Sequence, residues 1–241
     1  MNPKSAKFPG FPPETVKFFR SLKRNNNREW FLPRKELFEA KVKAPMIDLV
    51  EALNADLAGF APDYINDPKK AVYRIYRDVR FSVDKSPYKT HLAAIFPKRT
   101  GDRGASRDSV PGFYFHISAA GVGVAGGLYD PQPDQMFAVR SWLAQNHPAF
   151  LKACRSAEKL MGQLQGESLQ RVPKGFDAGH PAADLLKMKR WAFHAMLPAD
   201  LIPSPKLQRE LEKRFEAMLP ALELLSLAAG SSKKMAAADF M

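Results

Sequence analysis

The feature of the sequence that most limits the fold is a change of hydrophobic pattern after Pro62. Before it, apolar residues recur every three or four positions, which is typical of amphipathic helices. After it come four short segments rich in β-branched and aromatic residues, at 72–81, 92–96, 113–118 and 122–129, which are typical of strands. Helical spacing returns over 134–146, 148–164 and 204–225, and another strand is expected at 190–197. This order predicts an α+β fold, in which a mostly antiparallel sheet is packed by N-terminal, central and C-terminal helices.

Several residues are suited to the ends or kinks of the expected helices. Pro13 favours the first turn of the first helix. Asn26, with Glu29 three residues later, resembles a capping box that opens a second helix. Pro45 is expected to kink or divide the long helix that the apolar spacing predicts around it. Ser204 is expected to cap the last helix.

Length and composition suit one globular domain. The 241 residues are 45% apolar and 26% charged, within the range of ordinary globular proteins. We expect a flexible N-terminus at 1–7, a single domain at 8–228 and a disordered tail at 229–241.

The sequence also indicates the compartment. No apolar stretch reaches the ~20 residues that cross a bilayer, and the N-terminus has no signal-peptide core, so we expect a cytoplasmic protein without a membrane partner. Cys154 is the single cysteine, and we expect it to be a small buried hydrophobic residue in a reducing compartment.

Positive charge is concentrated in one part of the chain. The net charge is +12, and residues 64–108 hold 11 Lys or Arg against 5 Asp. A concentrated positive field attracts phosphate ligands, nucleic acid or acidic protein surfaces. The field alone does not choose among them.

The segment RIYRDVRFSVDKSPYK, at 74–89, carries the most informative chemistry. If 72–81 is a strand, alternation places Arg77 on an apolar face, where a guanidinium is costly unless it is paired. Its partner is either Asp78 or Asp84, in an internal ion-pair network, or an external anion. The predicted anion-binding residues are Arg74, Arg77, Arg80, Lys85, Lys89 and Arg140. The candidates for orienting the ligand or transferring a proton are Asp78, Tyr88 and His116.

Other motifs point to no cofactor or metal. Gly121, Gly123 and Gly126 match GxGxxG, but the prolines that follow leave no helix N-terminus to face a pyrophosphate. A hairpin is favoured instead, with Gly126-Gly127 as a bulge or a close backbone approach. The five histidines lack metal-ligand spacing, and the arginines and lysines near Asp78 compete for its carboxylate.

The Arg-rich segment also carries a resemblance to a known family. FFRSLKRNNNREWF near the start, RIYRDVRFSVDKSPYK, the glycine strand GVAGGLYDP and Arg140 resemble a widespread, mainly bacterial family catalogued as domain of unknown function 2461. The resemblance covers roughly residues 8–228, and its RxxRDxRF core followed by DK and PYK is specific. It implies one module with the Arg-rich segment as its signature, and it implies no activity.

Three hypotheses for the function follow. The leading one is a domain, enzymatic or not, that binds a phosphorylated or other anionic small molecule in a cleft between the sheet and the helix expected at 133–146. The second is a nucleic-acid-binding protein in which the loop 98–107 and Lys69-Lys70 follow a phosphate backbone; weak, non-specific binding is expected from bulk charge in any case. The third is a structural or interaction module whose signature is an internal ion-pair network.

Overall fold

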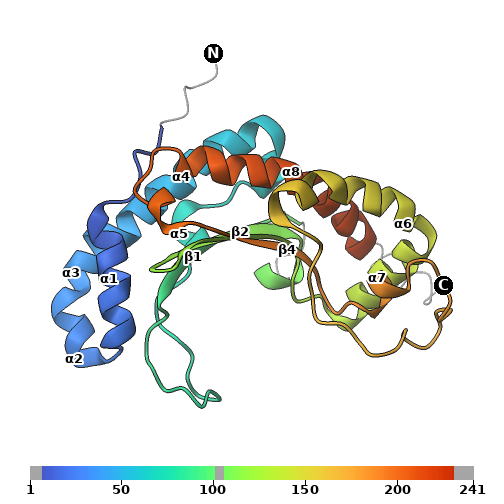
Figure 1. The fold of residues 1–241 in the computed structure, drawn as a ribbon, viewed down its shortest axis with the longest axis horizontal. Helices are drawn as coiled ribbons and strands as arrows, with labels where there is room; N and C mark the ends of the chain where they lie inside the picture. Colours follow the sequence, from blue (N-terminus) through green and yellow to red (C-terminus); the bar gives the residue numbers. More distant parts are fainter. Residues whose placement is uncertain (1–6, 101–105, 231–241) are drawn as a thin grey trace. The chain divides into compact units, whose positions relative to one another are not determined.

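The computed structural model describes residues 7–100 and 106–230. Its elements follow the predicted order of helices, strands and helices (Figure 1). In chain order they are α1 Pro13–Arg24, α2 Arg28–Phe31, η1 Leu32–Arg34, α3 Lys35–Phe38, η2 Glu39–Lys43, α4 Ala44–Phe60, η3 Pro62–Tyr64, α5 Pro68–Ala71, β1 His91–Pro97, η4 Arg107–Ser109, β2 Gly112–Ser118, β3 Gly121–Leu128, α6 Pro133–Met161, α7 Ala183–Lys187, β4 Trp191–Leu197, η5 Ala199–Leu201 and α8 Leu207–Gly230.

The four strands form one antiparallel sheet in the order β1-β2-β3-β4, which confirms the α+β prediction. The predicted strand at 72–81 is wrong, for a reason given with the candidate site. The tail predicted to be disordered begins inside α8, which reaches Gly230. The rest of that prediction, at 231–241, and the flexible N-terminus at 1–6 lie outside the described residues.

The chain divides into two compact units. Unit 1 comprises Met1–Phe96, Tyr114–Val124 and Met196–Lys213, and unit 2 comprises Pro97–Phe113, Ala125–Ala195 and Arg214–Met241. Among the described residues, no helix is both long and apolar enough to cross a membrane.

An aromatic cluster holds the first helices of unit 1 together. Phe18 of α1 has its ring centroid 6.2 Å from that of Phe31 in α2 and 5.6 Å from that of Phe38 in α3. All three rings are buried, and burial of each stabilises the fold by about 1.5–3 kcal/mol. The short helices α2 and α3 therefore lie against α1 (Figure 1).

The residue that caps α2 is one position later than predicted. Asn27 accepts a hydrogen bond from the Trp30 amide (2.8 Å), which makes it the N-cap. The side chain of Asn26 instead bonds both backbone groups of Tyr88, at 2.9 and 3.1 Å. Asn26 thus joins the α1–α2 junction to the Arg-rich segment.

The long helix predicted around Pro45 is divided, as expected, just before this proline. A single π-helical turn, η2, separates α3 from α4, and Pro45 lies in the first turn of α4, where a missing amide hydrogen costs little. The last helix starts later than predicted, because Ser204 caps a turn through the Lys206 amide and α8 begins at Leu207.

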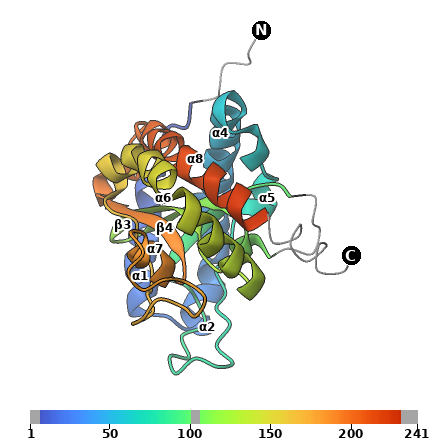
Figure 2. The same ribbon diagram turned by 90° about the vertical axis from the view of Figure 1, so that its right-hand side faces the viewer.

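In unit 2, α6 runs through Pro148 with a break in its backbone geometry at Asn146. The part of α8 that belongs to unit 2 lies beside α6 (Figures 1 and 2). Phe215 of α8 stacks on Phe113 with a centroid distance of 4.6 Å. This stack fixes α8 to the first residues of β2.

The glycine strand is the second strand of the β2–β3 hairpin, as predicted. A Cβ atom on Gly127 would lie 2.1 Å from the Trp191 carbonyl oxygen, so only glycine lets β3 approach β4 this closely. A Cβ on Gly123 would lie 2.0 Å from the His116 imidazole, which therefore covers that glycine. The glycines serve strand packing here, and β3 continues to Leu128 without the helix that a dinucleotide fingerprint requires.

Candidate anion-binding site

The Arg-rich segment is a loop on a short two-stranded stem. Within unit 1, an isolated bridge joins Tyr76 to Tyr88, and the Arg77 amide donates to the Pro87 carbonyl (2.9 Å). Asp78 ends the predicted strand at 72–81, because its side chain accepts the backbone amide two residues later, from Arg80 (3.2 Å). Asp84, just beyond that segment, forms the same kind of turn by accepting the Ser86 amide (2.9 Å). Such turns compete with the hydrogen bonds of a sheet.

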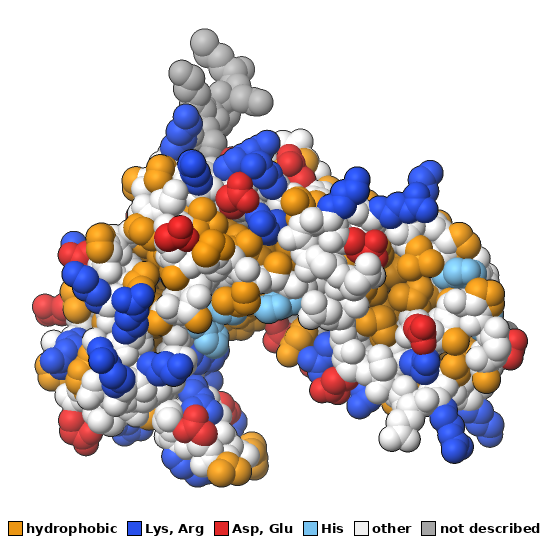
Figure 3. Space-filling model, viewed as in Figure 1, with side chains coloured by type: hydrophobic (Ala, Val, Ile, Leu, Met, Phe, Trp, Pro, Cys, Tyr) orange, Lys and Arg blue, Asp and Glu red, His pale blue; other side chains and the backbone are white. Residues whose placement is uncertain are grey.

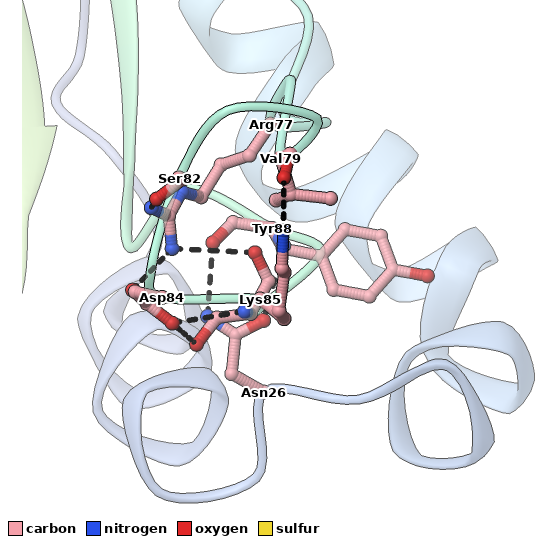
Figure 4. Close-up of polar contacts among 8 residues, drawn as sticks. Asn26, Arg77, Val79, Ser82, Asp84, Lys85 and Tyr88 are labelled. Atoms are coloured by element: carbon pink, nitrogen blue, oxygen red, sulfur yellow. Dashed lines mark hydrogen bonds and ion pairs between the residues drawn. The ribbon is translucent and has the colours of Figure 1, made fainter.

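Arg77 is held inside this loop (Figure 4). Its guanidinium pairs with Asp84 and also donates to the Ser86 carbonyl and the Ser82 hydroxyl, both at 3.3 Å. The Ser86 hydroxyl donates to Asp84 at 2.5 Å. These contacts engage both terminal nitrogens of Arg77 within the loop, as the internal-network hypothesis expects.

The other charged groups of the loop are also engaged there. Arg80 forms a two-point contact with Asp78, at 3.0 and 2.7 Å, and Lys85 donates to the Val79 carbonyl at 3.0 Å. The side-chain hydrogen bond from Arg80, aided by the Arg80 amide, lowers the pKa of Asp78 to about 2. Bonds from the Ser86 hydroxyl and amide, and then from Arg77, lower the pKa of Asp84 to about 2. Both carboxylates are therefore charged at neutral pH and take up no proton there.

Arg74 borders a groove in unit 1, and its charge also helps to lower the pKa of Asp78. The groove has a volume of about 580 Å³ and lies among α3, η2, α4, α5 and the residues 72–76. Arg74 is exposed, and it forms no ion pair with any residue that the structure describes. Lys43 and Lys69 also line the groove, so three cationic side chains share it.

The remaining lining of the groove is mostly apolar or aromatic. Glu39 is its one carboxylate, and it pairs with Lys43 at 2.7 Å. The apolar and aromatic lining comprises Phe38, Ala44, Ile47, Val72, Tyr73, Ile75 and Tyr76. The groove therefore combines an excess of positive charge with an apolar floor.

The sequence did not single out Lys43 or Glu39 as site residues. They belong to the polar side of the first long helical segment, whose charges look like an ordinary solvated face. The helical spacing gave no sign that α3 and α4 face Arg74, which is 31 positions from Lys43.

Tyr88 and Lys89 have structural contacts. Tyr88 is buried and stacks on Phe31 with a centroid distance of 4.1 Å, and burial raises the pKa of its hydroxyl. Its hydroxyl therefore stays protonated at neutral pH. The Lys89 ammonium lies 5.1 Å from the centre of the Tyr73 ring, within cation–π range.

His116 lies on the sheet in unit 1. Its ring centroid is 5.0 Å from that of His91 and 5.8 Å from that of Tyr114. Burial, together with the charge of Lys89, lowers the pKa of His91, so this neighbour of His116 is neutral at physiological pH.

Arg140 is a buried residue of α6 in unit 2. It is 8% exposed and donates to the Met188 carbonyl at 3.0 Å, while its Nε atom has no hydrogen-bond partner among the described residues. Burial lowers the pKa of its guanidinium. Its assignment to the anion site stays a prediction.

Two lysines that the nucleic-acid hypothesis assigns to a phosphate backbone have contacts or neighbours within the chain. Lys98 pairs with Glu223 in unit 2, and Lys69 lies on the groove in unit 1. Residues 101–105 of the predicted contact loop lie outside the described residues. Among residues 7–100 and 106–230, no three His, Cys, Asp or Glu side chains are grouped as a metal site would require.

Comparison with known proteins identifies the family. The model of the family described as "Conserved hypothetical protein (DUF2461)" matches residues 14–223. The chain therefore belongs to this family, as its sequence motifs predicted. No curated protein and no solved structure matches it significantly.

Proposed function

We propose that the protein binds an anionic small molecule in the groove of unit 1, through Arg74, Lys43 and Lys69. The observation that carries this proposal is the placement of three cationic side chains on a 580 Å³ groove that contains one carboxylate. Arg74 gives the strongest support, because its planar guanidinium is suited to two-point contact with phosphate or carboxylate.

The apolar floor narrows the class of ligand. Phosphate alone would leave the exposed Tyr76 ring and the half-buried Ile47 and Val72 side chains in contact with water, whereas a ligand with an apolar or aromatic part would cover them. Tyr73 and Tyr76 offer rings on which a flat group can pack. The ligand we propose is therefore an anion that carries such a group.

This assignment differs from the predicted set of binding residues in the roles of Arg77 and Arg80. Both guanidiniums already contact carboxylates within the loop, so an external anion would have to displace Asp84 or Asp78. In the proposed function, the network positions the stem that carries Arg74 and Tyr76.

Thermal unfolding with added ligand tests the proposal. Inorganic phosphate and phenyl phosphate are added to the wild type, to Arg74→Ala and to the control Arg155→Ala, which removes the same charge from an exposed position on α6. A ligand present at 100 times its Kd stabilises the folded state by about 2.7 kcal/mol. We expect phenyl phosphate to raise the melting temperature more than phosphate does, and only Arg74→Ala to abolish the increase.

Equal stabilisation of all three proteins would show that the anions act through bulk charge. It would refute the assignment to the groove.

A further inference from the structure

Two apolar side chains are exposed at the end of the Arg-rich loop. Phe81 is 95% exposed and Val83 is fully exposed. They belong to the segment 80–85, called the tip below, and Figure 3 shows hydrophobic side chains at the end of the loop that projects downward in this view. Single exposed apolar side chains are common, but two of them side by side on an ordered loop offer an anchor of the kind that contributes most to binding when a partner buries it.

The tip is ordered by its polar groups rather than by its apolar ones. Asp84 accepts from Ser86 and Arg77, and Lys85 donates to the Val79 carbonyl. The polar side chains therefore bond the loop's own backbone and each other, while Phe81 and Val83 point into solvent. Because the loop is already ordered, burial of its apolar side chains by a partner should cost little additional conformational entropy.

The chain itself carries a pocket that suits these two side chains. The pocket lies in unit 2 and has a volume of about 440 Å³, within the ~300–1,000 Å³ that accommodate drug-sized ligands. Its apolar lining comprises Leu151, Cys154, Leu164, Leu185 and Met188. Leu151 is 46% exposed, so part of this apolar surface faces water.

The charges of the pocket and the tip are opposite. Glu158 and Asp184 line the pocket, although the chain as a whole carries a net charge of +12. Glu158 forms no ion pair with another residue in the described ranges, and the same is true of Lys85 on the tip. The charges of Arg80 and Asp84 on the tip are balanced by Asp78 and Arg77, so Lys85 is the cation that the tip offers to a partner.

We propose that the tip of one copy of the protein inserts Phe81 and Val83 into the unit 2 pocket of a second copy, where Lys85 faces Glu158. A contact between two different surfaces of identical chains produces either a pair that exchanges tips or a longer series. This self-association is independent of the proposed function, because it uses neither Arg74 nor the groove.

Analytical ultracentrifugation over a range of concentrations tests the association. The tip variant carries Phe81→Ser and Val83→Ser, and the pocket variant carries Leu151→Lys and Glu158→Lys. The control carries Leu32→Ser and Leu227→Ser, which are 61% and 63% exposed and belong to neither surface. We expect the wild type and the control to associate with rising concentration, and each test variant to associate at least tenfold more weakly.

Mixing the two variants gives a sharper result. The tip variant keeps an intact pocket and the pocket variant keeps an intact tip, so an equimolar mixture should form a one-to-one complex that neither variant forms alone. If the pocket variant does not fold, Glu158→Lys alone should weaken association, and Lys85→Glu in the same chain should restore it.

Several results would overturn the proposal. The proposal fails if the wild type remains monomeric up to its solubility limit, or if the tip variant still associates as the wild type does. It also fails if the equimolar mixture of the two variants does not form the complex. Co-sedimentation with phosphatidylserine vesicles tests the alternative that the tip binds a lipid surface. A monomeric wild type that binds these vesicles through Phe81 and Val83 would assign the tip to a lipid surface instead.

Discussion

Three consecutive asparagines provide a test of how the Arg-rich segment is held on the first helices. Asn26 makes two hydrogen bonds to the backbone of Tyr88, a buried residue. Alanine at position 26 removes both bonds and leaves an amide and a carbonyl without their partner. With about 1 kcal/mol for each bond and a further penalty for buried polar groups, we expect a loss of about 2–4 kcal/mol in the free energy of unfolding.

The neighbouring asparagines serve as matched controls. Asn27→Ala removes the N-cap of the short helix α2 and should cost about 1 kcal/mol. Asn25 is exposed and its side chain donates to the Ser21 carbonyl on the same helix, so Asn25→Ala should change stability by less than about 0.5 kcal/mol. Urea unfolding gives the three free energies, and hydrogen exchange gives the protection of the Tyr88 amide.

The exchange measurement separates this explanation from a general loss of stability. Only Asn26→Ala should speed exchange of the Tyr88 amide relative to other amides of the stem. A larger effect at Asn27 than at Asn26 would refute the reasoning. An unchanged Tyr88 amide in Asn26→Ala would also refute it and would support Asn26 as the cap, as the sequence had suggested.

Two further predictions concern unit 2. Gly127→Ala should destabilise the protein by about 3 kcal/mol or more, because the added Cβ would clash with the Trp191 backbone. The control is Gly175→Ala, at a position that also has a positive φ but where no atom lies within 4 Å of the added Cβ, so it should cost only about 1–2 kcal/mol. Chemical denaturation measures both losses. Burial, aided by the charge of Glu158, raises the pKa of the Cys154 thiol to about 12, so Cys154 should resist alkylation at pH 8. The contribution of this thiol to stability should be present below pH 9 and should decline by about 1.4 kcal/mol per pH unit between pH 9 and 12, because the unfolded chain ionises first. Urea unfolding of Cys154→Ala should show no such decline.

The sequence predicts the elements whose hydrophobic pattern is local. The strands at 113–118 and 122–129 follow from runs of β-branched and aromatic residues, and the hairpin between them follows from Gly121. The segment 72–81 has the same kind of composition, yet it forms a loop. Within it, Asp78 accepts the backbone amide of Arg80, so turn formation by aspartate prevails over β propensity, and Asp84 forms a second such turn just after it.

The candidate site could be predicted only in part. Arg74 was found because it belongs to a dense cationic segment. Lys43 and Phe38 could not be found, because they meet Arg74 only through long-range packing of α3 and α4. The roles of Arg77 and Arg80 depend on which carboxylate each side chain reaches, and the sequence left the internal network and the external anion as equal alternatives.

The π-helical turn η2 makes the groove sensitive to the number of residues in the chain. A π-turn closes its hydrogen bond over five residues rather than four, so it holds one residue more than a turn of α-helix. Phe38 and Glu39 reach the groove from its start, and Lys43 and Ala44 reach it from its end. Removal of one residue would restore a continuous α-helix and rotate Phe38 by about 100° relative to Lys43. A family member that lacks this residue would keep the same hydrophobic pattern on either side of the turn but not the groove, so gaps at η2 in an alignment would separate members that have this groove from members that do not.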